Sequence, residues 1–311
     1  MTAAPLGTIS PPSPGLASTL RTVASDIKLA HSVFALPFAV LGAFLARPEA
    51  SPWPRFLGQL ALIILCMVLA RTWAMVVNRL ADRALDARNP RTKNRAFASG
   101  KLSPTTGVVV LVSCNLLFLA AASLFWFFFR NPWPVILAEA VLLWIGFYSF
   151  TKRFTWLCHV FLGGALAASP LAAAIAIDPA ALAATHALWY LAGMVVLWVA
   201  GFDIIYALQD VDIDRAERLW SVPSRLGIPA ALWLSRAMHA GAAALLILAC
   251  RSEPRFGLIF AVGITLVVAL LIAEHVVLAK RGKAGLDMAF FTINGVVSCG
   301  LGIAGCLDTL V

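Results

Sequence analysis

Charge is scarce in this 311-residue sequence, where only 13% of the residues are Asp, Glu, Lys or Arg. A soluble domain carries roughly 25% charged residues, so this chain has about half of the charge that a water-exposed surface needs. Hydrophobic residues make up 61% of the chain, and the mean hydropathy is +0.89. The shortage of charge excludes an ordinary soluble protein and indicates that lipid is the main solvent.

The cysteines and the net charge exclude two further classes of function. The six cysteines show no metal-ligand spacing and lie in or beside apolar stretches, which is typical of small buried core residues. The net charge of +9 comes from basic residues between apolar blocks, where they set membrane topology. We therefore expect no nucleic acid partner, and nothing in the sequence indicates a protein partner.

The beginning of the chain lacks the features of a secretory signal. Its first 20 residues contain neither a basic start nor an apolar run, and they are rich in Pro, Ser and Gly. We expect residues 1–20 to form a disordered tail and residues 21–311 to form a single transmembrane domain.

Apolar blocks of about 20 residues recur along the chain, which is the length that crosses a hydrocarbon core about 30 Å thick. Because lipid offers the backbone no hydrogen-bonding partner, blocks of this length must be helices. We therefore expect an all-α polytopic membrane protein with about nine transmembrane helices. The expected spans are residues 27–46, 56–80, 104–128, 134–151, 156–177, 187–209, 228–250, 256–279 and 285–307.

The basic residues of the connections predict the orientation. The N-terminal segment and the even-numbered connections carry 17 Lys and Arg residues, among them Lys28, and the odd-numbered connections carry five. Basic residues stay on the cytoplasmic side, so we expect a cytoplasmic N-terminus and an external C-terminus. The connections after spans 2 and 6 then lie together on the cytoplasmic face.

Two acidic motifs lie in or beside those two connections. The end of span 2 reads Asn78-x-x-x-Asp82-x-x-x-Asp86, and the end of span 6 reads Asp210-x-x-x-Asp214. Residues four apart on a helix share one face, with Cβ atoms about 5–6 Å apart. Each helix end is therefore expected to present a column of oxygen ligands.

A column of carboxylates at a membrane boundary repels itself unless a cation binds to it. An aspartate at mid-bilayer costs roughly 2.5–3.5 kcal/mol, and less near the interface. Mg²⁺ prefers hard oxygen ligands and is often completed by phosphate oxygens. Two columns facing one cavity could therefore hold Mg²⁺ ions that bridge to a diphosphate, whereas a single such motif would be no more than a solvated charge or a helix cap.

Arg71 is unusual because it lies inside span 2, on the helix face of Asn78. A buried arginine needs an anionic partner. Two possibilities stay open for Arg71, namely an ion pair with Asp203 or Glu139, or a bond to a substrate anion such as an aromatic carboxylate.

Further basic residues surround the motifs and could neutralise phosphate oxygens. Any one of them alone is better explained as a topology marker. They are Arg91, Lys93, Arg95, Lys152, Arg153 and Arg225.

These residues resemble the UbiA superfamily of intramembrane prenyltransferases, whose pattern places Asn-x-x-x-Asp-x-x-x-Asp after span 2 and Asp-x-x-x-Asp after span 6. The resemblance covers the chain from about residue 21. Phe34–Ala39 and Asp203–Asp210 are most similar to the bacterial branch known as 4-hydroxybenzoate polyprenyltransferase. The matching positions are Arg71, Asn78, Asp82, Asp86, Arg91, Thr92, Asn94, Arg95, Ser99, Gly100, Tyr148, Lys152, Arg153, Thr155, Asp203, Tyr206, Ala207, Asp210 and Asp214.

The resemblance implies nine helices around a central cavity and a Mg²⁺-dependent enzyme of the bacterial inner membrane. Such an enzyme moves a polyprenyl group from polyprenyl diphosphate to an aromatic acid. By position, the catalytic residues would be Asp82, Asp86, Asp210 and Asp214, and Asn78 would join these four as a metal ligand. The substrate-binding residues would be Arg71, Asn78, Arg91, Arg95, Tyr148, Lys152, Arg153, Asp203 and Tyr206.

Other interpretations remain at this stage. The acceptor could be 4-hydroxybenzoate, as in ubiquinone biosynthesis, or 1,4-dihydroxy-6-naphthoate, as in the futalosine route to menaquinone. An ion-coupled transporter would also use intramembrane carboxylates, although the sequence shows no internal repeat. The sequence indicates no firm proton acceptor: Asp203 faces the same way as Asp210, and His31 is interpreted as structural.

Overall fold

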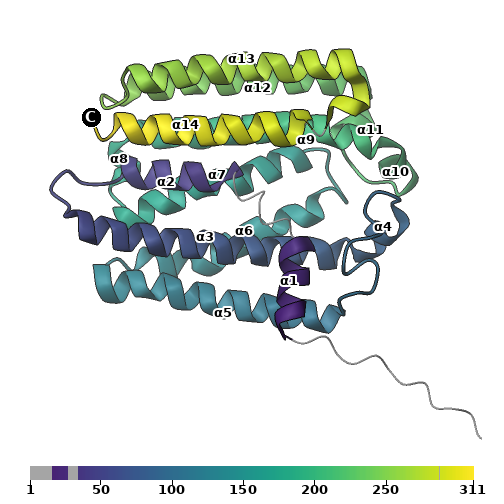
Figure 1. Cartoon of the computed structure of the whole chain (residues 1–311), viewed down its shortest axis with the longest axis horizontal. Coiled ribbons are helices and arrows are strands. Elements are labelled where there is room, and N and C mark those ends of the chain that lie inside the picture. Colours follow the sequence, from purple (N-terminus) through teal and green to yellow (C-terminus); the bar gives the residue numbers. More distant parts are fainter. Residues whose placement is uncertain (1–15, 27–33, 287) are drawn as a thin grey trace, which may run out of the picture.

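The computed structural model describes residues 16–26, 34–286 and 288–311, and all regular structure within them is helical (Figure 1). The longer helices lie side by side in one bundle. The elements are α1 (Leu16–Asp26), α2 (Leu36–Leu45), α3 (Trp53–Ala81), α4 (Arg83–Arg88), α5 (Pro104–Phe129), α6 (Trp133–Thr151), α7 (Cys158–Ile177), α8 (Ala181–Ala184), α9 (His186–Tyr206), η2 (Ala207–Gln209), α10 (Val211–Ala216), α11 (Val222–Leu226), α12 (Ile228–Ser252), α13 (Leu258–Arg281), η3 (Gly282–Gly285), the π-helical η4 (Met288–Ile293) and α14 (Asn294–Asp308).

Eight helices in the described part of the chain are long and apolar enough to cross a membrane. They correspond to the second to ninth expected spans, so the prediction of an all-α polytopic membrane protein is confirmed. The first expected span differs, because α2 has only ten residues, fewer than the roughly 20 that a full crossing requires. The expected positions of Lys28 and His31 lie outside the described residues.

The expected disordered tail ends earlier than residue 20, because α1 already begins at Leu16. Asp26 at the end of α1 holds this helix on the bundle. Its carboxylate lies 3.4 Å from Nε of Arg79 on α3 and accepts a 2.6 Å hydrogen bond from the backbone N–H of Ala96. Residues 1–15 of the expected tail lie outside the described residues.

The core of the bundle is built around α9, the most deeply buried of the eight long helices. Trp198 and Leu191 on α9 are completely buried. Close packing depends on small residues, because a Cβ atom on Gly163 of α7 would lie only 2.4 Å from the carbonyl oxygen of Val196 on α9. This use of small residues is typical of helix contacts in membranes.

Three of the short helices mark the end of the bundle where both acidic motifs lie. α4, α10 and α11 lie together at one end of the bundle, while α8 and the C-terminus lie at the opposite end (Figure 1). The flanks between the two ends expose large apolar side chains such as Leu116, Phe127 and Leu143, which suits contact with lipid. Both acidic motifs belong to the end formed by α4 and α10.

Candidate functional site

Both acidic motifs lie where a long helix breaks and a six-residue helix follows. Asp82 separates α3 from α4 at φ −95° and ψ 6°, and Asp210 precedes α10 at φ −107° and ψ 7°. Across each break the backbone keeps one bond of 2.7 Å, from Asp86 N–H to the carbonyl of Asp82 and from Asp214 N–H to that of Asp210. Each motif therefore runs through a kink at its aspartate and not along one continuous helix.

The kinks turn the four aspartates toward one polar cavity of about 110 Å³. Their side chains are largely withdrawn from the surface, with exposed fractions of 26% for Asp82, 9% for Asp86, 11% for Asp210 and 1% for Asp214. Basic side chains occupy the same walls, so the cavity contains both signs of charge at short range. The basic residues that line it are Arg91, Arg95, Lys152 and Arg153.

The first motif is paired with two of these basic residues. Nη1 of Arg95 contacts both carboxylate oxygens of Asp86, at 2.8 and 2.9 Å. Nη2 of Arg153, which follows α6, lies 3.3 Å from Oδ1 of Asp82. Charge-assisted contacts of this kind are stronger than neutral hydrogen bonds.

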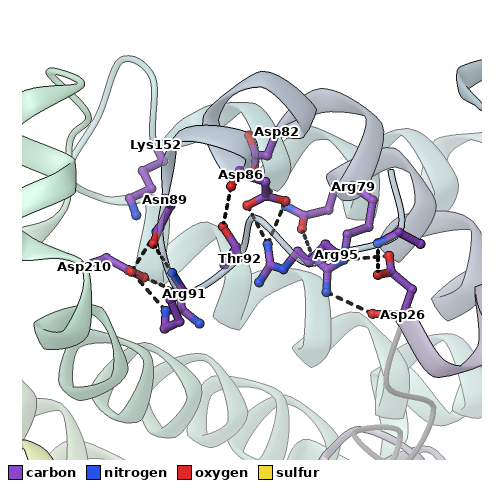
Figure 2. A network of polar contacts seen from close by, with 12 residues as sticks. Asp26, Arg79, Asp82, Asp86, Asn89, Arg91, Thr92, Arg95, Lys152 and Asp210 are labelled. Atoms are coloured by element: carbon purple, nitrogen blue, oxygen red, sulfur yellow. Dashed lines mark hydrogen bonds and ion pairs between the residues drawn. The ribbon is translucent and has the colours of Figure 1, made fainter. Parts of the chain in front are cut away.

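The second motif is paired in the same manner, with partners from distant parts of the chain. Asp210 accepts hydrogen bonds from the guanidinium of Arg91 and, at 3.1 Å, from the amide of Asn89 (Figure 2). Asp214 lies 2.7 Å from Nζ of Lys152. The connection that follows the first motif therefore bonds directly to the second motif.

These surroundings shift the pKa values of Asp82 and Asp210 in opposite directions. Burial raises the pKa of Asp82, and the nearby charge of Asp86 adds to this effect, while the bond from Arg153 offsets only part of it. Burial also acts on Asp210, but the hydrogen bonds and charge of Arg91 outweigh it and hold the pKa of Asp210 below its usual value. Asp210 is therefore firmly ionised at neutral pH, and Asp82 is the more easily protonated carboxylate.

Lys152 stays charged although it is half-buried. Burial alone would lower its pKa, but the charge and hydrogen bond of Asp214 raise it above the ordinary lysine value. Lys152 is thus a fixed positive group in the wall of the polar cavity.

A second cavity, of about 370 Å³, is lined almost entirely by apolar side chains from α3, α5, α6 and α7. Arg71 and Tyr148 are the polar exceptions of greatest reach, and Tyr148 directly precedes Ser149, which lines the polar cavity. Nε of Arg71 is buried and has no hydrogen-bond partner among the described residues. A cationic side chain is therefore directed into an otherwise apolar space.

Neither carboxylate that the sequence offered as a partner for Arg71 pairs with it. Asp203 lies 2.6 Å from Nδ1 of His159, and Glu139 accepts hydrogen bonds of 3.1 and 3.2 Å from Asn115. The first of the two possibilities for Arg71, an ion pair with Asp203 or Glu139, is therefore not formed.

Three other predicted residues lie beside the polar cavity without lining it. The oxygen of Asn78 accepts a hydrogen bond from Arg79, and its amide donates to Asp82 at 3.2 Å. Tyr206 accepts a 3.1 Å hydrogen bond from Arg91, and Asp203 faces His159. These contacts place them among the supports of the ion-paired residues.

Several polar residues of the site were not predicted from the sequence. Asn89 and Thr92 line the polar cavity, Ser221 bonds to Asp214, and His159 bonds to Asp203. Asn89 and Thr92 could have been found, since they flank Arg91 in the connection after the first motif. Ser221 and His159 gave no signal, because their roles depend on contacts between separate helices.

The donor set of the polar cavity is suited to a hard cation, because it consists of carboxylate, amide and hydroxyl oxygens. In the described part of the chain, however, no three His, Cys, Asp or Glu side chains converge closely enough to hold a metal ion. The carboxylates contact basic side chains instead.

Comparison with known proteins gives a consistent result. The profile of the UbiA prenyltransferase family matches residues 35–296. The chain is 32% identical over 245 residues to a protein named 4-hydroxybenzoate octaprenyltransferase from Saccharophagus degradans, with 76% of each chain covered. It is 28% identical over 239 residues to a protein of the same name from Shewanella loihica, covering 76% of this chain and 80% of that one.

Solved structures share the fold. A UbiA homologue from Aeropyrum pernix K1 in its apo form aligns with a TM-score of 0.79 at 30% identity, over 90% of this chain and 98% of that chain. A UbiA homologue from Archaeoglobus fulgidus bound to GPP and Mg²⁺ aligns with a TM-score of 0.64 at 18% identity, over 93% and 100% of the two chains. The second likeness concerns the fold alone.

Proposed function

This chain belongs to the UbiA prenyltransferase family, and on that premise we propose that it transfers a polyprenyl group from polyprenyl diphosphate to an aromatic acid. The observation that supports this most is a pair of cavities, one lined by Tyr148 and the other by the next residue of α6, Ser149. One is polar and contains four aspartates and four basic residues, and the other is apolar and contains Arg71. A substrate with a diphosphate head and a long hydrocarbon tail needs both environments.

Mg²⁺ is the cofactor that we propose for the polar cavity. Asp82, Asp86, Asp210 and Asp214 would hold it, and Asn78 would support Asp82 from outside the cavity. Bound there, Mg²⁺ would neutralise negative charge on the leaving diphosphate.

The basic side chains of the cavity would exchange partners when the donor binds. Arg91, Arg95, Lys152 and Arg153 now contact carboxylates, and a diphosphate would offer them phosphate oxygens with the same charge. The aspartates would then be free to bind the cation. Preorganised positive groups of this kind stabilise the charge that develops on the diphosphate as the allylic C–O bond breaks.

The apolar cavity would hold the hydrocarbon tail and the reacting carbons. Its walls would keep water from the allylic cation until a ring carbon of the acceptor forms the new C–C bond and the ring then loses its proton. Arg71 would bind the carboxylate of the aromatic acid, with Tyr148 beside it. The name shared by the curated relatives favours 4-hydroxybenzoate as the acceptor.

The proposed location is the inner membrane of a bacterial cell, with the N-terminus and the polar cavity on the cytoplasmic side. The bias of basic residues supports this orientation. It would expose the cavity to diphosphate substrates and Mg²⁺ in the cytoplasm.

Membranes containing the protein would test the function when incubated with a labelled polyprenyl diphosphate, Mg²⁺ and a panel of aromatic acids. We expect transfer to 4-hydroxybenzoate, and transfer to 1,4-dihydroxy-6-naphthoate in its place would assign the other acceptor. Asp82→Asn and Asp210→Asn should each abolish transfer. Asp212→Asn is the matched control, because Asp212 is exposed on α10 and does not line the cavity.

The proposal fails if wild-type membranes transfer no prenyl group to any acceptor. It also fails if Asp82→Asn and Asp210→Asn both retain full activity. Uptake of an ion driven by the membrane potential, without release of diphosphate, would instead support the transporter interpretation.

A further inference from the structure

We propose that His159 is a positioning residue for the second acidic motif, because its imidazole fixes the segment that holds Asp214 in the polar cavity. The inference rests on the proposed function, since it assigns Asp214 to the binding of a cation and a diphosphate. His159 lies on α7, is almost fully buried, and lines neither cavity. It therefore acts through other residues.

Asp214 is fixed by two side-chain contacts. Its Oδ2 accepts a 2.7 Å hydrogen bond from the hydroxyl of Ser221, and its Oδ1 lies 2.7 Å from Nζ of Lys152. Both Asp214 and Ser221 are buried, with exposed fractions of 1% and 0%. The direction of the carboxylate therefore depends on where Ser221 lies.

Ser221 belongs to a segment that is bonded to α7 and to the end of α6. The backbone N–H of Val222 donates to Nε2 of His159 at 3.2 Å. The backbone N–H of Trp220 donates to the carbonyl of Lys152 at 2.7 Å. The residues before and after Ser221 are therefore both fixed by hydrogen bonds. On the C-terminal side of Ser221, the bond to α7 is the one from Val222 to the imidazole of His159.

The hydrogen bonds also fix the tautomer of His159. A backbone N–H can only donate, so Nε2 must accept and carries no proton. The ring proton is then on Nδ1, which lies 2.6 Å from Oδ2 of Asp203 and donates to it. Asp203 therefore orients the ring, much as carboxylates orient metal-binding histidines.

These contacts form one chain of bonds from α9 to the polar cavity. It leads from Asp203 through His159 and the backbone of Val222 to Ser221 and Asp214. The chain gives Asp203 a role in orienting His159. It also predicts that removal of the imidazole changes the affinity of the cavity for its ligands more than it changes the folding of the bundle.

The test compares His159→Leu, His159→Gln and Ser221→Ala in the purified full-length protein. Leucine can make neither hydrogen bond, whereas the single amide of glutamine can donate to Asp203 and accept from Val222. The first measurement is the stabilisation of the protein against heat by Mg²⁺ with inorganic diphosphate. The second is hydrogen exchange of residues 217–224 without added ligand.

We expect His159→Leu to raise the Mg²⁺ concentration for half-maximal stabilisation by about 10- to 100-fold, the usual effect of losing a residue that orients a metal ligand. Exchange in residues 217–224 should accelerate. His159→Gln should restore most of the Mg²⁺ dependence. Because Ser221→Ala breaks the same chain of bonds, its effect should not add to that of His159→Leu in the double variant.

His275→Leu serves as the control for removing an imidazole from the bundle, because His275 lies on α13 and lines neither cavity. An unchanged Mg²⁺ dependence in folded His159→Leu, or additive effects in the double variant, would overturn the inference. If His159→Leu does not fold, Ser221→Ala decides by the same two measurements.

The outcomes also separate this inference from the proposed function. If the wild type transfers prenyl groups and His159→Leu behaves like the wild type, the inference about His159 alone is wrong. If the wild type transfers nothing, but the Mg²⁺ dependence of stabilisation shifts in His159→Leu, the proposed reaction alone is wrong.

Discussion

At the scale of single residues, the polar cavity brings side chains of opposite charge together at short range. Each of the four aspartates contacts at least one basic side chain, and these partners come from the connection after α4 or from the end of α6. Pairs of buried charges contribute little net stability, because desolvation offsets their attraction. Their retention in a chain with only 13% charged residues is better explained by binding than by folding.

Replacing Arg71 should raise KM for the acceptor and leave KM for the donor unchanged. Arg71→Leu removes a half-buried guanidinium whose Nε has no hydrogen-bond partner among the described residues, so we expect KM for the aromatic acid to rise about 30-fold or more, which corresponds to about 2 kcal/mol. KM for the polyprenyl diphosphate should stay close to that of the wild type. Steady-state kinetics with each substrate varied in turn would measure this, and equal rises in both values would contradict the assignment.

Asp210 should make the stability of the protein depend on pH at the acid end. Its folded pKa is lowered by Arg91, so its contribution is complete above the unfolded value of about 3.9 and is lost as pH falls through the folded value. Thermal unfolding in detergent with EDTA, compared between wild type and Asp210→Asn, should show a difference in Tm that shrinks below about pH 4. A difference in Tm that grows on acidification would contradict a lowered pKa for Asp210.

At the scale of helices, composition and spacing predicted the fold closely. Spans two to nine could be placed within a few residues, because a block of about 20 apolar residues has one stable structure in lipid. The breaks at Asp82 and Asp210 could not be predicted, since a period of four residues fits an unbroken helix equally well. The bonds of His159 were also hidden, because they join it to residues 44 and 63 positions away. The bond from Ser221 to Asp214 spans only seven positions, but it depends on how the chain turns between α10 and α11.

The contact between α2 and α7 should tolerate no side chain at Gly42. A Cβ atom there would lie 2.3 Å from the carbonyl oxygen of Pro170, so Gly42→Ala should destabilise the protein by about 1–3 kcal/mol. Gly300→Ala is the matched control, because no atom lies within 4 Å of a Cβ at this position on α14. Thermal unfolding of the two variants in detergent would compare them, and equal Tm values would refute the close approach.

At the scale of the whole molecule, the two cavities occupy different parts of the bundle and differ in polarity. The polar one lies at the end with α4 and α10, and the apolar one extends along α6 from Tyr148 to Pro134. Fourteen residues of helix correspond to about 21 Å, which is most of the hydrocarbon thickness. The resemblance of the motifs implied a polyprenyl donor, but the position of the apolar cavity could not be predicted, because it depends on how four helices pack.

The depth of the apolar cavity should limit the length of the donor. Ala138 lies deep in it and is 1% exposed, so Ala138→Phe should obstruct the far part of the cavity. We expect this variant to lose activity with a long polyprenyl diphosphate and to keep it with geranyl diphosphate. Competition between the two donors would measure the change, and an equal loss with both would place the tail elsewhere.

The orientation of the molecule can be tested without an assay of the reaction. If basic residues set the topology, a protease-cleavable tag after Val311 should be cut from outside intact spheroplasts. A tag inserted beside the exposed Lys101, in the connection after the first motif, should be protected until the membrane is opened. The reverse pattern would place the polar cavity outside the cell.

The bonds from Asn89 and Arg91 to Asp210 have a consequence for the synthesis and membrane insertion of the protein. They join residues 121 and 119 positions apart, so the first motif enters the membrane long before its partner has been synthesised. Until α9 arrives, a nascent chain has Arg91 and Asn89 at the membrane surface without this carboxylate. The polar cavity can therefore form only late in synthesis. A chain truncated before α9 should be degraded by quality-control proteases.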